Sequence, residues 1–103
     1  MQFIVMGYDG TDEGALERRM AAREAHLKVC ADSVANGTQL IGAAMMDASG
    51  KMNGSCMIMN FDTRAELDAW LKSEPYIAGK VWERVDVIEC KVPDTFKHCF
   101  KKT

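Results

Sequence analysis

The order in which strand-like and helix-like segments follow one another limits this chain to very few folds. Short apolar stretches rich in β-branched and aromatic residues alternate with longer stretches whose apolar residues recur every three or four positions, as on one face of a helix. Turn residues separate most of these segments. The pattern predicts strands over residues 2–8, 38–46, 52–61 and 81–90, and helices over residues 15–36 and 63–73.

Local signals mark the ends of the predicted helices. Residues 15–36 contain no Gly or Pro, and Asn36-Gly37 follows with residues that tolerate the left-handed conformation in which many helices end. Thr63, with Glu66 three residues later, has the capping-box pattern of a helix start.

The resulting order β-α-β-β-α-β is the ferredoxin-like plan of an α+β protein, a four-stranded antiparallel sheet with two helices on one face. A chain of 103 residues, 48% of them apolar, suits one compact core. We therefore expect residues 1–103 to form a single domain, with residues 91–103 as a C-terminal tail at an edge or against a partner.

Two helices cover only one face of such a sheet, yet the strands direct apolar residues, including many of the eight methionines, toward both faces. Monomers rarely leave a large apolar surface open to water. We therefore expect the second face to pair with the sheet of another copy, giving a homodimer. Whether such dimers stack further is left open.

Composition and motifs exclude several classes of function. Thirteen Lys and Arg against fifteen Asp and Glu give a formal net charge of −2, without the clustered positive charge that nucleic acids require. No apolar run approaches the roughly 20 residues of a spanning helix, and no signal peptide is evident, so we expect a cytoplasmic protein without a membrane partner. The four cysteines form no C-x-x-C pair, which favours buried thiols over disulfides. His98 and Cys99 with Cys90 lack the spacing of a zinc site, so no metal is expected.

The first predicted helix carries the most informative polar residues. Its apolar positions form one stripe that we expect to be buried: Leu16, Met20, Leu27, Cys30, Ala31 and Val34. Arg23 falls inside this stripe, and His26 lies at its edge one turn further on. Because a guanidinium is costly to bury alone, Arg23 either extends outward to solvent or faces a polar pocket between helix and sheet, which His26 would border. In the structural alternative, Arg23 pairs with a carboxylate and His26 caps the edge of the core.

Three short motifs give the chain a resemblance to a known family. The first motif is Ala22-Arg23-Glu24-Ala25-His26-Leu27, in the first predicted helix, which follows a short strand and an acidic loop in the chain. Ser73-Glu74-Pro75-Tyr76 stands between the second helix and the last strand, and residues 61–66 lead into the second helix. In this order and spacing, the motifs resemble those of the YciI-like family over roughly residues 3–89.

The resemblance implies a ferredoxin-like subunit that dimerises into an α/β barrel-like assembly, with a cleft where a His and an Asp are proposed to act as a catalytic dyad. His26 matches the His, whereas Glu74 stands at the Asp position with one more methylene. Arg23 matches the family's Arg and suits a carboxylate or phenolate oxygen of a ligand. Tyr76, directly after the Glu74-Pro75 turn, is expected to line the pocket and offer its hydroxyl.

An imidazole oriented by a carboxylate is a competent general base or acid. We therefore expect a small cofactor-free enzyme of lyase or isomerase type, acting on a small anionic or phenolic molecule, with His26 as base, Glu74 orienting it and Arg23 binding the anion. A family member that dehydrochlorinates a chlorinated hydroquinone fits this chemistry. The alternative is a non-catalytic dimeric domain that binds a small molecule, and a cofactor-free monooxygenase of the related dimeric barrel superfamily rests on fold analogy alone.

Overall fold

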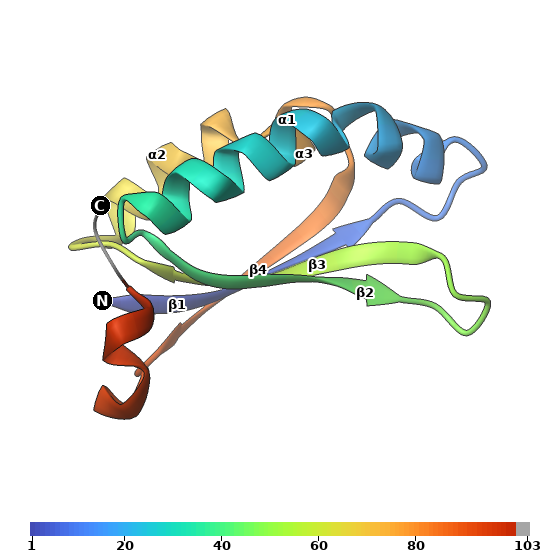
Figure 1. The fold of residues 1–103 in the computed structure, drawn as a ribbon. Helices are drawn as coiled ribbons and strands as arrows, with labels where there is room; N and C mark the ends of the chain where they lie inside the picture. The colour runs from blue at the N-terminus through green and yellow to red at the C-terminus, as the bar shows by residue number, and fades with distance from the viewer. Residues whose placement is uncertain (101–103) are drawn as a thin grey trace.

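A four-stranded antiparallel sheet carries three helices on one of its faces in this computed structural model, which describes residues 1–100 (Figure 1). The strands lie in the order β2-β3-β1-β4, and every neighbouring pair is antiparallel. The ferredoxin-like α+β fold predicted from the sequence is confirmed. The elements are β1 Gln2–Asp9, α1 Ala15–Ala35, β2 Gln39–Met46, β3 Met52–Asn60, α2 Arg64–Ser73, α3 Pro75–Ala78, β4 Trp82–Cys90 and the 3-10 helix η1 Asp94–Cys99.

The segment between α2 and β4 forms a third short helix, α3, where the sequence predicted only a turn. Pro75 begins α3, at a position where the missing N–H of proline costs nothing. Glu74 ends α2 in an extended conformation and also caps α3, because its Oε1 accepts the backbone N–H of Tyr76 at 3.2 Å. This double role fixes the place of the Glu74 carboxylate beneath α1.

The signals expected at the helix ends form the contacts that they predict. Thr63 Oγ1 accepts the backbone N–H of Glu66 at 3.2 Å, and Glu66 Oε2 accepts the backbone N–H of Asp62 at 3.3 Å. Beyond α1, Gly37 adopts a φ of 84°, a conformation that costs glycine little. The chain therefore leaves α1 and begins α2 where the sequence indicates.

Alternation along β1 decides which side chains of the sheet face the helices. Phe3 and Val5 are buried on this face, and they pair across the sheet with Met59 and Met57 of β3. Leu67 of α2 closes over them. The complete core cluster is Phe3, Val5, Met57, Met59, Leu67, Tyr76, Val81 and Trp82.

The buried face of α1 is not the one predicted. Its buried residues are Ala15, Arg19, His26 and Ser33. Apolar positions expected inside are about half exposed, with Met20 at 51%, Leu27 at 46% and Val34 at 45%. The prediction considered only apolar side chains, whereas these polar side chains are buried because hydrogen-bond partners lie opposite them.

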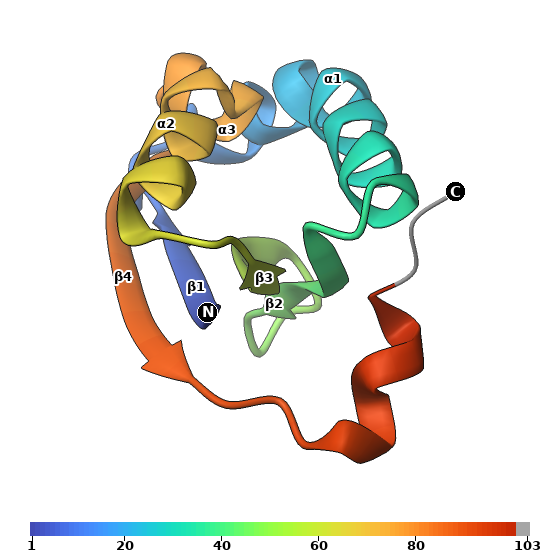
Figure 2. The ribbon, with the colours of Figure 1, turned by 90° about the vertical axis from the view of Figure 1, so that its left-hand side faces the viewer.

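The face of the sheet opposite the helices is partly open to solvent. Ile41 is 57% exposed and Ile88 is 52% exposed on this side. The tail, for which the sequence predicted an edge or partner contact, places η1 beside this face (Figure 2), with a mostly apolar cavity of about 470 Å³ lined by residues of both, among them Ile58 and Phe96. Residues 101–103 of the predicted tail lie outside the described part of the chain.

All four cysteines are free thiols, as expected, but none is fully buried, so their description as buried hydrophobic residues is wrong. Cys30 lies on the face of α1 that borders a pocket, which gives it a neighbourhood unlike that of the others. Within residues 1–100, no helix is long and apolar enough to cross a membrane.

We expect Gly7→Ala to destabilise the protein by about 1–3 kcal/mol. An ideal Cβ at Gly7 lies 2.3 Å from Cε2 of Trp82, a buried ring whose Nε1 donates to Ser55 Oγ at 3.3 Å. Urea unfolding followed by far-UV circular dichroism measures the loss. Gly14→Ala is the matched control, because its Cβ meets most closely the flexible end of Arg18, at 3.2 Å. Equal losses in the two variants would contradict the close packing of Gly7 against Trp82.

Candidate functional site

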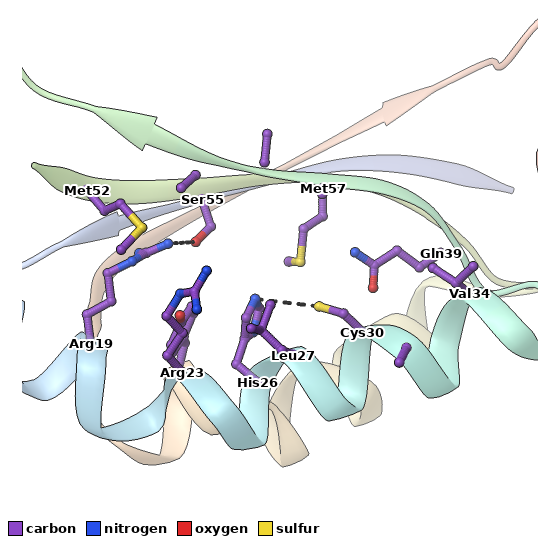
Figure 3. Close-up of a pocket in the computed structure, with 15 residues that line it drawn as sticks. Arg19, Arg23, His26, Leu27, Cys30, Val34, Gln39, Met52, Ser55 and Met57 are labelled. Atoms are coloured by element: carbon purple, nitrogen blue, oxygen red, sulfur yellow. Dashed lines mark hydrogen bonds between the residues drawn. The ribbon is translucent and has the colours of Figure 1, made fainter. Parts of the chain in front are cut away.

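A pocket of about 330 Å³ lies between α1 and the part of the sheet formed by β2 and β3 (Figure 3). This volume is at the lower end of those that hold small molecules. Apolar side chains line part of the wall, and the polar members of the lining are Arg19, Arg23, His26, Cys30, Gln39, Ser55 and Tyr76. Such a mixture suits a small molecule with a few polar groups.

His26 and Glu74 meet at the back of this pocket. His26 Nδ1 lies 2.6 Å from Glu74 Oε1, and the Glu74 side chain is fully buried while that of His26 is 10% exposed. Since an ionised carboxylate only accepts hydrogen bonds, the imidazole donates its Nδ1–H. The longer side chain of Glu74, compared with the Asp that the family resemblance led us to expect, therefore still reaches the imidazole.

The Glu74 carboxylate has few other partners. Oε1 also accepts the Tyr76 backbone N–H, while Oε2 has no hydrogen-bond partner among residues 1–100. A buried carboxylate is costly unless a positive group lies next to it. The His26 imidazole is the group in contact with Glu74 that can supply this charge.

Two aromatic side chains fix the plane of the His26 ring. The Tyr76 ring stacks on it with 3.9 Å between centroids and an interplanar angle of 13°. The Trp82 ring lies edge-on to the His26 ring, with 6.3 Å between centroids and an interplanar angle of 80°. Tyr76 is thus a wall of the site, and the expectation that its hydroxyl contacts a ligand stays a prediction.

A buried arginine, missed in the sequence, lines the same pocket as His26. Arg19 is 3% exposed, and its Nη1 donates to both carboxylate oxygens of Asp9, at 3.0 and 3.1 Å. Its guanidinium also lies 4.7 Å from the centroid of the Tyr76 ring. A signal was present, because Arg19, Arg23 and His26 recur at spacings of four and three residues and so share one helix face.

Ser55 completes this polar end of the site from β3. Its Oγ accepts hydrogen bonds from Arg19 Nη2 at 2.9 Å and from Trp82 Nε1 at 3.3 Å. These two bonds use both acceptor positions of the hydroxyl. The Ser55 hydroxyl, which lines the pocket, therefore keeps its own hydrogen to donate.

Arg23 is exposed and lines the pocket without a carboxylate partner. Among residues 1–100, the ion pairs of the arginines involve Arg18, Arg19, Arg64 and Arg84, and none involves Arg23. Of the arrangements left open by the sequence, pairing with a carboxylate is not seen within residues 1–100; the Arg23 side chain is open to solvent and also lines the pocket. The site therefore holds one arginine neutralised by Asp9 and one whose charge is available.

The charge state of His26 follows from its neighbours. Burial alone would lower the pKa of His26, but hydrogen bonds with Cys30 and Glu74, together with the charge of Glu74, raise it to about 9. Cys30 Sγ lies 3.5 Å from Nε2, the nitrogen opposite the one that contacts Glu74. Burial raises the pKa of the Asp9 carboxyl, and Arg19 opposes this effect.

Within residues 1–100, no three His, Cys, Asp or Glu side chains form a group that could hold a metal ion. Glu74 and Cys30 lie on opposite nitrogens of the His26 ring, so these three groups do not converge on one point.

Fold and site together define a class: a ferredoxin-like α+β protein with a buried His–carboxylate pair at a pocket between the first helix and the sheet. The model of the YCII-related domain family matches residues 1–91. The chain belongs to this family, as the sequence motifs predicted.

Relatives and solved structures agree with this membership. Proteins named YciI from Escherichia coli and Shigella flexneri are each 29% identical over 94 residues, which cover 84% of this chain and 93% of theirs. The 5-chloro-2-hydroxyhydroquinone dehydrochlorinase of Burkholderia phenoliruptrix, solved with 2,5-dihydroxybenzoquinone, has a TM-score of 0.80 at 21% identity, over 92% of this chain and 98% of that one. A dimeric ferredoxin-like protein of unknown function from a Jannaschia species has a TM-score of 0.52 at 17% identity, over 88% and 98%.

We expect His26→Gln to remove a pH-dependent part of the stability. The pKa of His26 rises from 6.5 to about 9 on folding, so its contribution is complete below pH 6.5 and is lost as the pH rises through about 9. Urea unfolding of both proteins between about pH 6 and pH 10 measures this. The advantage of the natural protein over the variant should shrink by roughly 1–2 kcal/mol, with screening at the pocket mouth included. Titrating groups that do not contact His26 cancel in the comparison, and an advantage that stays constant with pH would contradict the raised pKa.

Proposed function

We propose that this chain is a small enzyme that moves protons to and from an anionic or phenolic molecule through the acid–base chemistry of His26 and Glu74. The observation that carries this proposal is the 2.6 Å contact between a fully buried carboxylate and an imidazole that lines a pocket. A carboxylate in this position holds the imidazole in one tautomer and stabilises its protonated form.

The protonation state of His26 sets the order of the proton transfers. Because its pKa is about 9, His26 carries its proton at neutral pH and begins as a general acid, not as the base that we expected from the sequence. It protonates an enolate or phenolate carbon and then takes up a proton from the substrate in a later step. Proton exchange alone isomerises the substrate, and departure of a leaving group after protonation completes an elimination.

Two groups in the pocket are available for the oxygens of such a substrate. Arg23 brings a guanidinium without a carboxylate partner among residues 1–100, and Ser55 has a hydroxyl hydrogen to donate. Charge-assisted hydrogen bonds from a guanidinium stabilise a developing enolate or phenolate. Tyr76 and Trp82 keep the imidazole at a fixed angle to the bound ring.

The dehydrochlorinase of the same fold supports the reaction class. Its name describes removal of hydrogen chloride from a chlorinated hydroquinone, a reaction in which a proton and a chloride ion leave the substrate. An acid–base residue and a cation beside a phenolate suit such chemistry. At 21% identity, this likeness suggests the kind of reaction for this chain and leaves its substrate to experiment.

Binding without catalysis is the second candidate, and one observation favours it. Nε2 of His26, the nitrogen that would face a substrate, is already 3.5 Å from Cys30 Sγ. In a binding domain, His26 would serve as a fixed positive charge beside Arg23 and hold an anion without exchanging protons.

We also propose that two copies associate through the open face of the sheet. Ile41 and Ile88 expose more than half of their surface there, and Ile4 and Ile58 lie on the same face. Apolar side chains gathered in this way are typical of an interface. One solved protein of the same fold is itself described as dimeric, which agrees with this proposal.

Two molecules taken from the structural relative serve as probes of the site. We expect the protein to bind 2,5-dihydroxybenzoquinone, measured by isothermal titration calorimetry, and to release chloride from 5-chloro-2-hydroxyhydroquinone. His26→Gln should slow chloride release about 10²–10⁴-fold, the usual contribution of a general acid or base. Quinone binding should change less, because Arg23 and Ser55 remain.

Lys28→Gln is the matched control for these measurements, since Lys28 lies on α1 with a side chain that is 79% exposed. An equal effect of His26→Gln and Lys28→Gln would contradict the dyad. Binding of the quinone without chloride release from the natural protein would favour the binding-domain alternative, and absence of both would contradict the ligand class.

We expect size-exclusion chromatography with light scattering, at micromolar concentration, to give twice the 11.5 kDa of the chain. Ile88→Glu should yield monomers, because it places a charge on the apolar face. Lys72→Glu, an exposed position on α2 at the opposite face, is the control and should leave the mass unchanged. A monomeric natural protein would rule the dimer out.

A further inference from the structure

We propose that Cys30 is a nucleophilic thiol, activated by His26 and Glu74, that adds to electron-poor alkenes conjugated to a carbonyl group when these enter the pocket. This goes beyond proton transfer, because it requires a covalent bond to sulfur. The proposal rests on the contact between Cys30 and His26 and on a buried polar atom of the pocket, Gln39 Oε1, that has no hydrogen-bond partner among residues 1–100.

Cys30, His26 and Glu74 form a continuous chain of polar contacts. Cys30 lies one helical turn after His26 on α1, and its Sγ is 3.5 Å from His26 Nε2 (Figure 3). On the other side of the ring, Nδ1 is 2.6 Å from Glu74 Oε1. A nucleophile within reach of a base, which a third group orients, is the arrangement of nucleophilic triads.

The Glu74 contact decides which nitrogen of His26 faces the Cys30 thiol. The carboxylate accepts from Nδ1–H, and because His26 carries its proton at neutral pH, the second N–H of the imidazolium lies on Nε2 and faces Cys30 Sγ. Stacking on Tyr76 and the contact with Glu74 hold the ring in this orientation. A positively charged N–H donor beside the sulfur favours the thiolate, the reactive form of cysteine.

The other cysteines lack this arrangement and provide controls inside the same chain. Cys99 Sγ lies at the same 3.5 Å from an imidazole nitrogen, that of His98, but the ion pairs of residues 1–100 include no carboxylate partner for His98. Cys90 and Cys99 line the apolar cavity beside η1, on the other side of the sheet. A comparison of Cys30 with Cys99 therefore isolates the effect of the buried carboxylate and of the pocket.

A second, independent feature of the pocket points to a ligand. Gln39 is 2% exposed and lines the pocket, yet its Oε1 has no hydrogen-bond partner among residues 1–100. Figure 3 shows its amide between the sheet and α1, at the end of the pocket where Cys30 lies. A buried amide oxygen without a partner favours a ligand that donates a hydrogen bond to it. An unsaturated carbonyl compound that bears a hydroxyl or N–H group meets this requirement, with its carbonyl oxygen toward Arg23.

The addition balances without any oxidant or reductant. The Cys30 thiol loses its proton to water, because His26 is already protonated at neutral pH, and the sulfur electron pair of the thiolate forms a C–S bond to the β-carbon of the alkene. The π electrons of the C=C bond move to give an enolate, whose charge Arg23 stabilises. The His26 imidazolium then gives its Nε2 proton to the α-carbon and regains one from water, so the net change is addition of S–H across the double bond.

N-Ethylmaleimide, an electron-poor alkene flanked by carbonyl groups, is the probe. The natural protein is labelled for a series of times at neutral pH, and peptide mass spectrometry follows each of the four cysteines separately. We expect Cys30 to react at least about tenfold faster than Cys99, and faster than Cys30 itself in the urea-unfolded chain. A half-buried thiol without activation reacts more slowly in the folded protein than in the unfolded chain, so a native rate at or below the unfolded rate would overturn the proposal.

His26→Gln and Glu74→Gln test the activation directly. Each should slow labelling of Cys30 about tenfold or more and leave the rate at Cys99 unchanged. Far-UV circular dichroism checks that the variants fold, and the comparison of native with unfolded natural protein decides the matter if they do not. An unchanged Cys30 rate in a folded His26→Gln variant would also overturn the proposal.

Labelling requires no turnover, so the two proposals fail in different ways. A protein that releases chloride from the hydroquinone probe but labels slowly at Cys30 keeps proton transfer and loses the nucleophilic thiol. Rapid labelling at Cys30 without chloride release gives the opposite result.

Discussion

A carboxylate with no access to water is the constraint on which the rest of this site depends. Glu74 is fully buried, and within residues 1–100 its carboxylate accepts hydrogen bonds from the His26 ring and the Tyr76 backbone N–H. Burial of such a charge is tolerable only beside a positive group. The pair therefore favours imidazolium, draws α1 onto the junction of α2 and α3, and places a proton donor at the pocket wall. One contact thus serves packing, charge and chemistry.

Polar groups hold α1 to the sheet where a typical amphipathic helix would use apolar ones. Arg19 reaches Asp9 at the end of β1 and Ser55 on β3, and these contacts use the helix face that lies closest to the sheet. The apolar side chains of α1 turn toward the pocket and solvent, as the exposure of Leu27 and Val34 shows. The polar contacts at one end of α1 set the distance between this helix and the sheet. Space therefore remains between the apolar edge of α1 and β2. That space is the pocket.

Most of the fold could be predicted because alternation, helical spacing and turn residues are local properties of the chain. Thr63 and Gly37 marked helix ends correctly for that reason. The buried face of α1 could not be predicted, because burial of Arg19 depends on Asp9 of β1 and Ser55 of β3. Only the folded arrangement brings these two residues next to Arg19. Family motifs marked His26 and Glu74, but not their separation or the third helix that positions Glu74.

The contact between His26 and Cys30 makes the two proposed chemistries compete for one nitrogen. Nδ1 is committed to Glu74, so any proton exchanged with a ligand passes through Nε2, which the thiol already occupies at 3.5 Å. A substrate for proton transfer must therefore displace the Cys30 sulfur from His26 Nε2, or exchange its proton with His26 through that sulfur. A ligand with an electrophilic carbon near Sγ meets the thiolate first. Whether a molecule is protonated or captured then depends on which of its atoms lies closest to Cys30 when Arg23 holds its oxygen.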